Sequence, residues 1–354
     1  MAMSGGVDSS VAAAWLVDQG YDVVGVTLHL WDYPDDGSVQ GRCCAPEDQH
    51  DARRVADHLG IPHYSFDRRE LFAREVVTPF VDAYLAGSTP SPCVACNRAV
   101  KMSELFALAD RLGAQKVATG HYARTVRNGD RVELHRGRDA SKDQSYFLHT
   151  LSSDQLARLE FPLGGATKTA VRAEALSRGL PGATKGESQE LCFVPAGRYE
   201  AFVEERAGAK IRPGPVVDGR GQLVGNHHGV HRFTVGQRKG LGIALGSPAF
   251  VVAIEPDTAT VRLGTSDDLL HMGARLNEAR FFEDVALPVR AEVKVRYRHE
   301  GVPAMIAREA DGGVSVTFDE PVRAVAKGQV AVAYAGDRVL GGGTIERAVA
   351  GVAN

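Results

Sequence analysis

The chain has 354 residues, of which 44% are hydrophobic and 24% charged, as in folded globular proteins and unlike disordered or fibrous ones. Its 41 Lys and Arg residues nearly balance 44 Asp and Glu residues, so any nucleic-acid surface must be a local patch rather than a basic field over the whole protein. No apolar run is long enough to span a bilayer, and the N-terminus lacks the basic and apolar regions of a signal peptide, so we expect a cytoplasmic protein. Five cysteines, an odd number, favour reduced thiols with chemical roles over a disulfide framework.

The first part of the chain predicts strands that alternate with helices. A Ser-Gly-Gly-Val-Asp-Ser-Ser segment at 4–10 leads into an apolar helical run, and a buried strand over 21–30 is followed by a helix over 52–59. A further helix over 103–112 precedes a strand that ends in a glycine turn, at 116–121. This alternation predicts a doubly wound parallel α/β sheet. A loop like that at 4–10 normally follows a strand, but three residues precede it, so we expect either a stunted first strand or a start assigned too late.

Beyond about residue 200 the sequence changes to short β-rich runs separated by Gly, Pro, Asn and Asp, which predicts all-β structure. The later runs have the spacing of a small barrel or sandwich. We therefore expect three domains: a catalytic α/β domain over 1–199, a small β-rich domain over 200–270 and a β-barrel over 275–354. The runs themselves lie at 215–217, 249–254, 260–263, 291–296, 314–318, 329–334 and 339–345.

The segment at 4–10 has the composition of a pyrophosphate-binding loop. Gly5 and Gly6 let the backbone approach a ligand closely, and the helix behind them presents N–H groups and the positive end of a helix dipole to phosphate. A Walker-type loop would need a Gly-Lys-Ser/Thr ending, which the chain does not contain. Loops of this kind resemble those of the ATP-pyrophosphatase superfamily, which cleaves ATP between its α and β phosphates and adenylates a substrate oxygen. A Ser/Gly turn that merely caps a helix is the alternative interpretation.

The cysteines form one close pair and scattered single positions. Cys93 and Cys96 have the spacing of a redox or metal-binding pair, and the proline-rich segment before them is expected to present both thiols ahead of a helix. A structural zinc site would need a second such pair, whereas Cys43 and Cys44 are adjacent and Cys192 stands alone, although a histidine could complete a site. A lone Cys192 would by itself indicate a small buried apolar residue.

Eight short motifs run in order along nearly the whole chain, at 4–10, 43–48, 92–97, 119–122, 142–148, 188–193, 234–240 and 340–345. Together they resemble the motifs of the bacterial tRNA-specific 2-thiouridylases, members of the ATP-pyrophosphatase (PP-loop) superfamily. A single Cys-x-x-Cys is weak evidence, but eight motifs in register make coincidence implausible.

The resemblance implies an ATP-dependent sulfur transfer to tRNA. In that family ATP adenylates O2 of the wobble uridine, and sulfur carried as a cysteine persulfide then displaces AMP, with Mg²⁺ bridging the ATP phosphates. By this resemblance Cys192 carries the persulfide, and Cys96 is the nucleophile that helps to release sulfur and pairs with Cys192 as a disulfide. The ATP site would be formed by Ala2, Met3, Ser4, Gly5, Gly6, Val7, Asp8, Ser9, Leu28 and Gly120.

The chain departs from the family pattern at Cys93, where many members carry an Asp that is proposed as a base toward the target uridine. Three thiols, those of Cys93, Cys96 and Cys192, are also the number that would hold a [4Fe–4S] cluster with one open iron, as related thiolation enzymes are thought to do. Two mechanisms of sulfur delivery therefore stay open, a cysteine persulfide relay and sulfide bound to an iron–sulfur cluster. Cys43 and Cys44 match the family but are assigned no role.

The resemblance also implies contacts with the anticodon loop of tRNA, whose unstacked bases and phosphates are gripped by basic and aromatic side chains. An Arg-Tyr-Arg run in the barrel fits that need, although such a run in a strand is more often a solvated face. The family preference would be tRNAs for Lys, Glu and Gln, with sulfur from a cysteine desulfurase or a relay protein. The expected tRNA contacts are Ser91, Pro92, Cys93, His121, Lys142, Asp143, Gln144, Arg296, Tyr297, Arg298 and Gln329.

Two other functions are considered. A PP-loop ligase would pass the adenylate to a nitrogen nucleophile and would not need Cys96 or Cys192. A tRNA-binding protein without catalysis would release neither AMP nor pyrophosphate.

Overall fold

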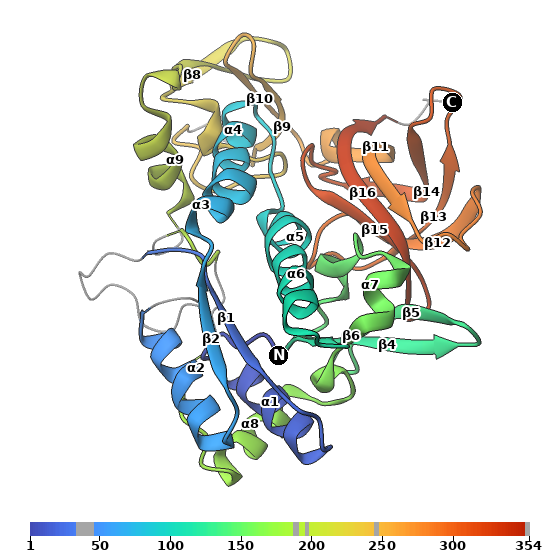
Figure 1. Cartoon of the computed structure of the whole chain (residues 1–354). Helices are drawn as coiled ribbons and strands as arrows, with labels where there is room; N and C mark the ends of the chain where they lie inside the picture. The colour runs from blue at the N-terminus through green and yellow to red at the C-terminus, as the bar shows by residue number, and fades with distance from the viewer. Residues whose placement is uncertain (33–45, 187–190, 195–197, 244–247, 351–354) are drawn as a thin grey trace. The chain divides into compact units, whose positions relative to one another are not determined.

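The computed structural model describes residues 1–32, 46–186, 191–194, 198–243 and 248–350 (Figure 1). The chain forms two compact units. The division into domains over 1–199, 200–270 and 275–354 stays a prediction. The first unit comprises Met1–Val76, Cys93–Arg198 and Asp337–Val339, and the second comprises Val77–Pro92, Tyr199–Gly336 and Leu340–Asn354.

A parallel sheet is the centre of the first unit, as the sequence predicts. The first three residues lie between two pairs of strands: the backbone N–H of Ala2 donates to Ala118 O at 2.8 Å, and that of Met3 donates to Val26 O at 2.8 Å. They act as a very short central strand, parallel to β1 at Ala2 and Val26. The flanking pairs are β1 (Gly25–His29) with β2 (His63–Asp67), and β3 (Val117–Ala118) with β6 (Leu159–Glu160).

Helix α1 (Val7–Asp18) is largely buried, because most of its own side chains are small or apolar and pack against two other helices. Val11 and Ala12 pack with Val171 of α8 (Lys168–Ser177), and Ala13 packs with Val55 of α2 (Pro46–Leu59). The remaining helices of this region are α3 (Arg69–Phe72), η1 (Ala73–Val77), α5 (Pro92–Ala95), η2 (Cys96–Met102), α6 (Ser103–Leu112), η3 (Ser145–Leu148), α7 (Ser153–Arg158) and η4 (Pro162–Gly165).

A β-hairpin of the first unit was not expected from the sequence. Strands β4 (Ala123–Asn128) and β5 (Arg131–Arg136) pair antiparallel, and His135 pairs with Arg338 at the start of β16. Arg and Asn residues hide the alternation of polar and apolar positions in this hairpin.

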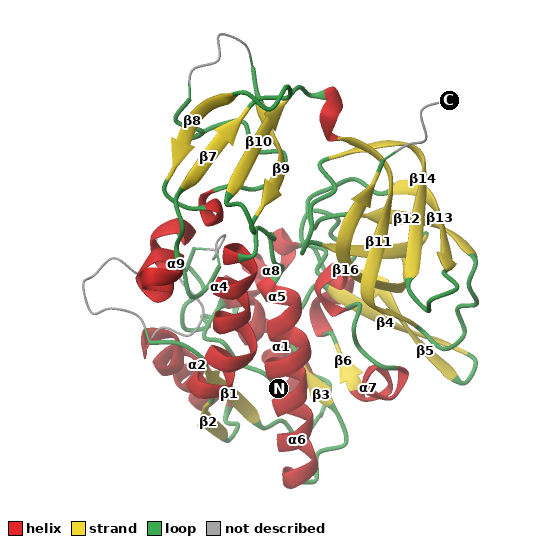
Figure 2. Cartoon of the chain, turned by 90° about the horizontal axis from the view of Figure 1, so that it is seen from above, coloured by secondary structure: helices red, strands yellow, loops and turns green. Residues whose placement is uncertain are grey.

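The second unit contains two β structures, drawn in yellow in Figure 2. One is a four-stranded sheet in the order β8-β7-β10-β9, and the other is a closed barrel in the order β11-β14-β13-β12-β15-β16, in which β16 returns to pair with β11. The predicted α/β, small β-rich and barrel architecture is confirmed. The strands are β7 (Gly214–Val217), β8 (Leu223–His227), β9 (Phe250–Glu255), β10 (Thr260–Gly264), β11 (Leu270–Phe281), β12 (Val289–Lys294), β13 (Val302–Arg308), β14 (Val314–Arg323), β15 (Val330–Ala335) and β16 (Arg338–Val349); the helices are α4 (Thr78–Leu85), α9 (Tyr199–Ala207), η6 (Gly208–Lys210), η7 (Val230–Arg232) and η8 (Asp267–Leu269).

Candidate active site

The Ser-Gly-Gly loop lies between the short central strand and α1, at the carboxyl edge of the parallel sheet. Gly5 has φ +73°, and a Cβ there would lie 2.1 Å from the backbone oxygen of Asp48 in α2, so no other residue fits without movement. Gly6 is the N-cap of α1, and the hydroxyl of Ser9 donates to Gly6 O at 3.0 Å. Because the first N–H groups of a helix have no acceptor within it, the loop presents donors to an anion.

Two further expected nucleotide contacts lie on β1 and just after β3, next to the short central strand. A Cβ on Gly120, after β3, would be 3.0 Å from the backbone nitrogen of Ser9, so the two backbones are in close contact. Leu28 lies on β1 beside Thr27, whose hydroxyl donates to Met3 O at 2.8 Å. The structure therefore brings Gly120 and Leu28 to the same sheet edge as the loop formed by Ala2, Met3, Ser4, Gly5, Gly6, Val7, Asp8 and Ser9.

Charged residues that the sequence reasoning missed surround the loop. Both carboxylate oxygens of Asp8 accept from Lys168 Nζ at 2.8 Å, and Tyr122 Oη donates to Asp8 Oδ1 at 2.7 Å. Lys168 is separated from Asp8 by 160 residues but stands at the first position of α8, directly after the N-cap residue Thr167. The first turn of α8 faces the first turn of α1, and only the fold reveals this proximity of Lys168 to Asp8.

A second lysine holds the chain segment at 182–185 near the loop. Lys185 Nζ pairs with Asp48 Oδ1 at 2.7 Å and also with Asp51. Burial lowers the pKa of Lys185, but the hydrogen bonds to these two carboxylates outweigh it, so the pKa is raised overall. Gly182 lies beside this pair and beside Gly5 O. Cations therefore stand on two sides of the loop, each balanced by carboxylates.

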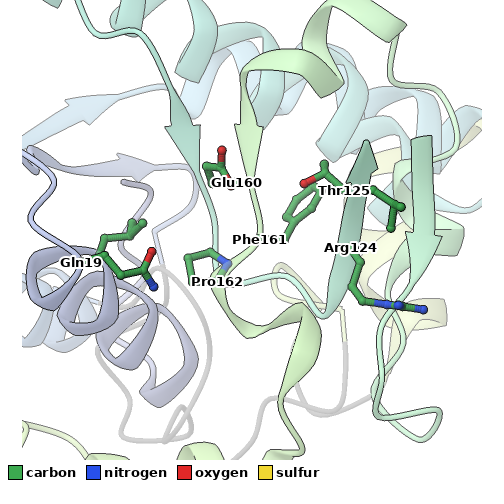
Figure 3. A pocket seen from close by; sticks show the side chains of 8 residues that line it. Gln19, Arg124, Thr125, Glu160, Phe161 and Pro162 are labelled. Carbon is green, nitrogen blue, oxygen red and sulfur yellow. The ribbon is translucent and has the colours of Figure 1, made fainter. Parts of the chain in front are cut away.

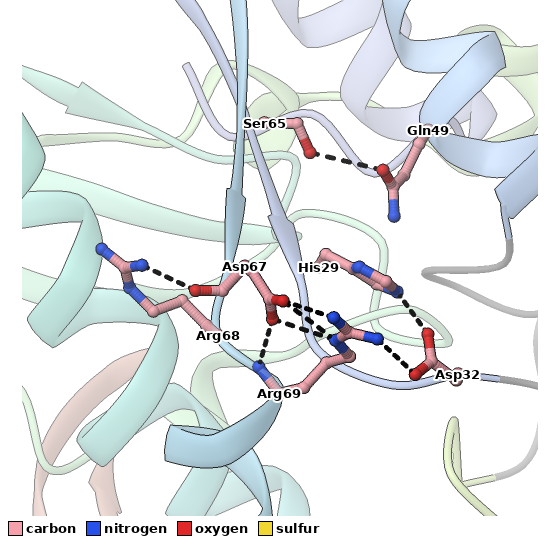
Figure 4. A network of polar contacts seen from close by, with 7 residues as sticks. All are labelled: His29, Asp32, Gln49, Ser65, Asp67, Arg68 and Arg69. Carbon is pink, nitrogen blue, oxygen red and sulfur yellow. Dashed lines mark hydrogen bonds and ion pairs between the residues drawn. The ribbon is translucent and has the colours of Figure 1, made fainter.

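The ends of β1 and β2 carry an exposed polar network at the same sheet edge (Figure 4). The guanidinium of Arg69 bonds to Asp67 at 3.0 Å and also to Asp32, while His29 Nε2 lies 3.0 Å from Asp32 Oδ1. The hydrogen bond from the Arg69 side chain holds the pKa of Asp67 far below its usual range. The network ties the residues after β1 to the start of α3.

The cysteine pair lies within a helix rather than ahead of one, which corrects the expectation from the sequence. Pro92 is the first residue of α5, where its fixed φ suits a helix, and α5, η2 and α6 follow one another without a break from Pro92 to Leu112. Cys93 is exposed, whereas Cys96 is buried and begins the π-helical stretch η2. Stretches of π-helix are frequent at functional sites.

Cys192 is partly exposed and lies in a turn at 191–194, closed by the N–H of Val194 donating to Leu191 O at 3.1 Å. Over the described residues, no three His, Cys, Asp or Glu side chains come together as a metal-binding group. Cys43 and Cys44 lie outside the described residues.

Several residues expected to contact tRNA also make hydrogen bonds within the first unit. Asp143 is buried and accepts from the backbone N–H groups of Gly137 and Ser145, each at 3.0 Å. Gln144 Oε1 accepts from the N–H of Tyr122 at 3.0 Å. Lys142, the neighbouring basic residue, is half-buried.

His121 is neutral at ordinary pH. Its Nδ1 lies 2.8 Å from Thr119 Oγ1, and burial, with a smaller effect of the Lys101 charge, lowers the pKa of His121 to about 3. The residue is therefore suited to hydrogen bonding or stacking rather than to pairing with a phosphate.

Expected tRNA residues of the second unit fall into two groups. Arg296, Tyr297 and Arg298 lie in the turn after β12, not in a strand, and both arginines are exposed while Tyr297 packs under Lys294 Nζ at 5.8 Å. Gln329 Nε2 donates to Thr89 O at 3.0 Å and to Pro90 O at 3.4 Å, and thereby fixes the backbone that leads to Ser91 and Pro92.

A cavity of about 210 Å³ in the first unit is separate from the loop (Figure 3). It adjoins the C-terminal end of α1, and at about 1.5 Å per residue this helix of 12 residues places that end roughly 18 Å from Gly6. The cavity is therefore not the nucleotide site. It is lined by Leu16, Gln19, Arg124, Thr125, Val126, Glu160, Phe161 and Pro162.

The fold and the loop together define a PP-loop nucleotide-binding protein of the HUP class. A family model described as "tRNA methyl transferase HUP domain" matches residues 1–196, "tRNA methyl transferase PRC-barrel domain" matches 200–265, and "Aminomethyltransferase beta-barrel domain" matches 272–345. None of the described helices is long and apolar enough to cross a membrane.

Curated relatives match the chain over almost its full length. The tRNA-specific 2-thiouridylase MnmA of Sorangium cellulosum is 64% identical over 99% of this chain and 92% of the relative, and that of Moorella thermoacetica is 48% identical over 98% of each. A solved U34-tRNA thiolase, NcsA from Methanococcus maripaludis with its [4Fe-4S] cluster, matches 59% of this chain and 66% of that chain at 16% identity and a TM-score of 0.34, too distant to support an argument. The chain belongs to the tRNA-specific 2-thiouridylase family.

Proposed function

We propose that this protein replaces O2 of the wobble uridine of tRNA by sulfur, using ATP to activate the oxygen. The observation that supports this most directly is that the nucleotide loop and Cys192 both lie near the ends of neighbouring parallel strands. The Ser-Gly-Gly loop follows the short central strand, and Trp31, which follows the parallel neighbour β1, packs on Phe193 beside Cys192 at a ring distance of 6.2 Å. Because parallel strands end at one edge of a sheet, this arrangement supports a single site for the loop and Cys192.

The first step is adenylation. O2 of uridine attacks the α phosphorus of ATP, the bond to the β-phosphate oxygen breaks, and pyrophosphate leaves. The N–H groups at the start of α1 and the cations of Lys168 and Lys185 are placed to stabilise the negative charge that develops on the leaving group. Mg²⁺ would be held mainly by phosphate oxygens and water, with Asp8 the nearest carboxylate on the loop.

The second step is sulfur transfer. The terminal sulfur of a Cys192 persulfide attacks C2 of the adenylated uridine, and AMP leaves with the former O2. The thiolate of Cys96 then attacks the inner sulfur of Cys192, which forms a Cys96–Cys192 disulfide and leaves the terminal sulfur on C2 as 2-thiouridine. A thiol reductant resets the disulfide by exchange. An adenylate is needed because a uridine oxygen is otherwise a poor leaving group.

Cys93 takes the place of a carboxylate in this scheme. Cys93 is exposed at the start of α5, where we propose that it faces the target base. The persulfide relay needs the thiols of Cys96 and Cys192 alone, and we route no step through a [4Fe–4S] cluster.

The tRNA is proposed to be gripped at the anticodon loop by Arg296 and Arg298 of the exposed barrel turn, with Tyr297 available for stacking. Lys142 and the neutral His121 would contact the RNA from the first unit. The tRNAs for Lys, Glu and Gln are the proposed substrates, a cysteine desulfurase or a relay protein is the proposed sulfur source, and the cytoplasm is the proposed location.

Single-cysteine variants test the proposal. With unmodified tRNA, ATP and a persulfide donor, Cys192→Ala and Cys96→Ala should form no 2-thiouridine by mass spectrometry, while tRNA-dependent pyrophosphate release persists in the first turnover. Cys43→Ala serves as the matched control because no role is assigned to that thiol, and Cys93→Asp should retain activity if the thiol replaces a base. A nitrogen-transferring ligase would instead turn over normally without Cys96 and Cys192.

A further inference from the structure

Three aromatic rings pack together beside Cys192. Trp31 and Phe193 are 6.2 Å apart between ring centroids, Trp31 and Phe72 are 6.3 Å apart, and Phe72 and Phe193 are 5.5 Å apart, all with edge-to-face geometry. Phe72 is fully buried, and Phe193 and Val194 are each 2% exposed. Edge-to-face contacts of this kind stabilise one orientation of the rings beyond simple apolar burial.

The cluster joins three segments that are distant in sequence. Trp31 lies two residues after the end of β1, Phe72 is the last residue of α3, and Phe193 belongs to the turn at 191–194. In that turn a completely packed side chain follows directly after the partly exposed Cys192. The backbone of Cys192 is therefore held by its neighbour's ring, while Cys192 itself is partly exposed.

The polar network of Figure 4 supports two of the three rings. Arg69, the first residue of α3, pairs with Asp32, which follows Trp31 directly. The same α3 ends in Phe72, so the ion pair and the ring contact fix both ends of this short helix against the residues after β1. Since β1 also carries Leu28 of the expected ATP site, the cluster and the nucleotide site share one strand.

We infer that the Trp31–Phe72–Phe193 cluster positions Cys192 for sulfur transfer, with Phe193 as the anchor and Trp31 as its link to the nucleotide-binding strand. This inference rests on the proposed function. Phe193 and Trp31 are positioning residues that touch neither substrate. They act by limiting where the sulfur of Cys192 can lie, and a displacement of about 1 Å in a reacting group can cost on the order of a hundred-fold in rate.

The test separates the two half-reactions. Phe193→Leu keeps an apolar side chain but removes the ring edge, and it should slow single-turnover formation of 2-thiouridine by about ten-fold or more while pyrophosphate release stays within about two-fold. Alkylation of Cys192 by iodoacetamide, followed by mass spectrometry of its peptide, should become faster. Trp31→Phe should resemble the unaltered protein, whereas Trp31→Ala should behave like Phe193→Leu.

Phe318→Leu is the matched control, because Phe318 is a fully buried phenylalanine of β14 that belongs to the barrel core. Corrected for the folded fraction, it should change neither half-reaction nor the alkylation rate of Cys192. Equal slowing of pyrophosphate release and sulfur transfer by Phe193→Leu, or no change in either, would overturn the inference. Failure of the inference alone leaves the unaltered protein able to form 2-thiouridine. If the unaltered protein forms no 2-thiouridine, the proposed function itself fails, so the two failures are distinguishable.

Discussion

Replacing Gly5 by Ala tests whether the Ser-Gly-Gly loop is built as described. The substitution adds one methyl group at a position with φ +73°, where an L-residue is strained by about 1–2 kcal/mol. The new Cβ would also lie 2.1 Å from Asp48 O. Because real Cβ atoms essentially never approach closer than 3.0 Å, the loop or the first turn of α2 must move by about 0.9 Å, the difference between 3.0 and 2.1.

This movement displaces the N–H groups that would face the phosphates. We expect the Gly5→Ala protein to lose about 2–5 kcal/mol of stability, the sum of the backbone strain and the cost of crowding. ATP affinity should fall on the order of a hundred-fold, because preorganised donors are moved away from the ligand.

Gly20→Ala is the matched control. Gly20 has φ +80°, but a Cβ there meets no atom within 4 Å, so this variant carries the backbone strain without the clash. Urea unfolding and isothermal titration with ATP would be measured for both variants. The difference between them isolates the contact with Asp48, and equal stability together with equal ATP affinity would refute the packing of the loop against α2.

Three further predictions follow from particular contacts. Lys168→Met removes the cation held 2.8 Å from the Asp8 carboxylate and should raise the KM for ATP about ten-fold. Lys116→Met removes an exposed ion pair and should change this KM by less than about two-fold; both values are measured by steady-state pyrophosphate release. Burial lowers the pKa of His149 from 6.5 to about 4, so between these pH values the unfolded chain binds a proton and the folded chain does not. The free energy of unfolding should therefore fall as the pH drops from 6.5 to about 4. In urea unfolding, His149→Gln should flatten this slope by about 1.4 kcal/mol per pH unit. Gln329→Ala should cost about 1 kcal/mol of stability and lower kcat more than tRNA affinity, as measured by thiolation kinetics and filter binding; an equal loss of affinity would instead indicate direct RNA contact.

The parallel sheet and the loop were predictable because their signals are local. The Ser-Gly-Gly segment specifies its own turn and helix start, and apolar spacing predicts the helical stretch over 103–112 and its end at Leu112, although the helix begins earlier, at Pro92. The barrel was also predicted, but β11 and β13 were missed. Residues such as Met305 of β13 face solvent, so the alternation along that strand is weak.

The support of the site could not be predicted, because it depends on contacts between distant residues. Nothing near Asp8 in sequence indicates Lys168, and nothing in the sequence around Asp143 shows that its carboxylate accepts backbone N–H groups. Arg296 and Arg298 were expected in a strand, but β12 ends before them, which places them in an exposed turn.

The central claim is that O2 of the wobble uridine is adenylated before sulfur replaces it. The most direct measurement uses tRNA with ¹⁸O at this oxygen, together with ATP and a sulfur donor, and mass spectrometry of the released AMP. The account predicts that the label leaves in the phosphate of AMP as 2-thiouridine forms. Unlabelled AMP accompanying 2-thiouridine, or AMP that carries oxygen from ¹⁸O water instead, would contradict it.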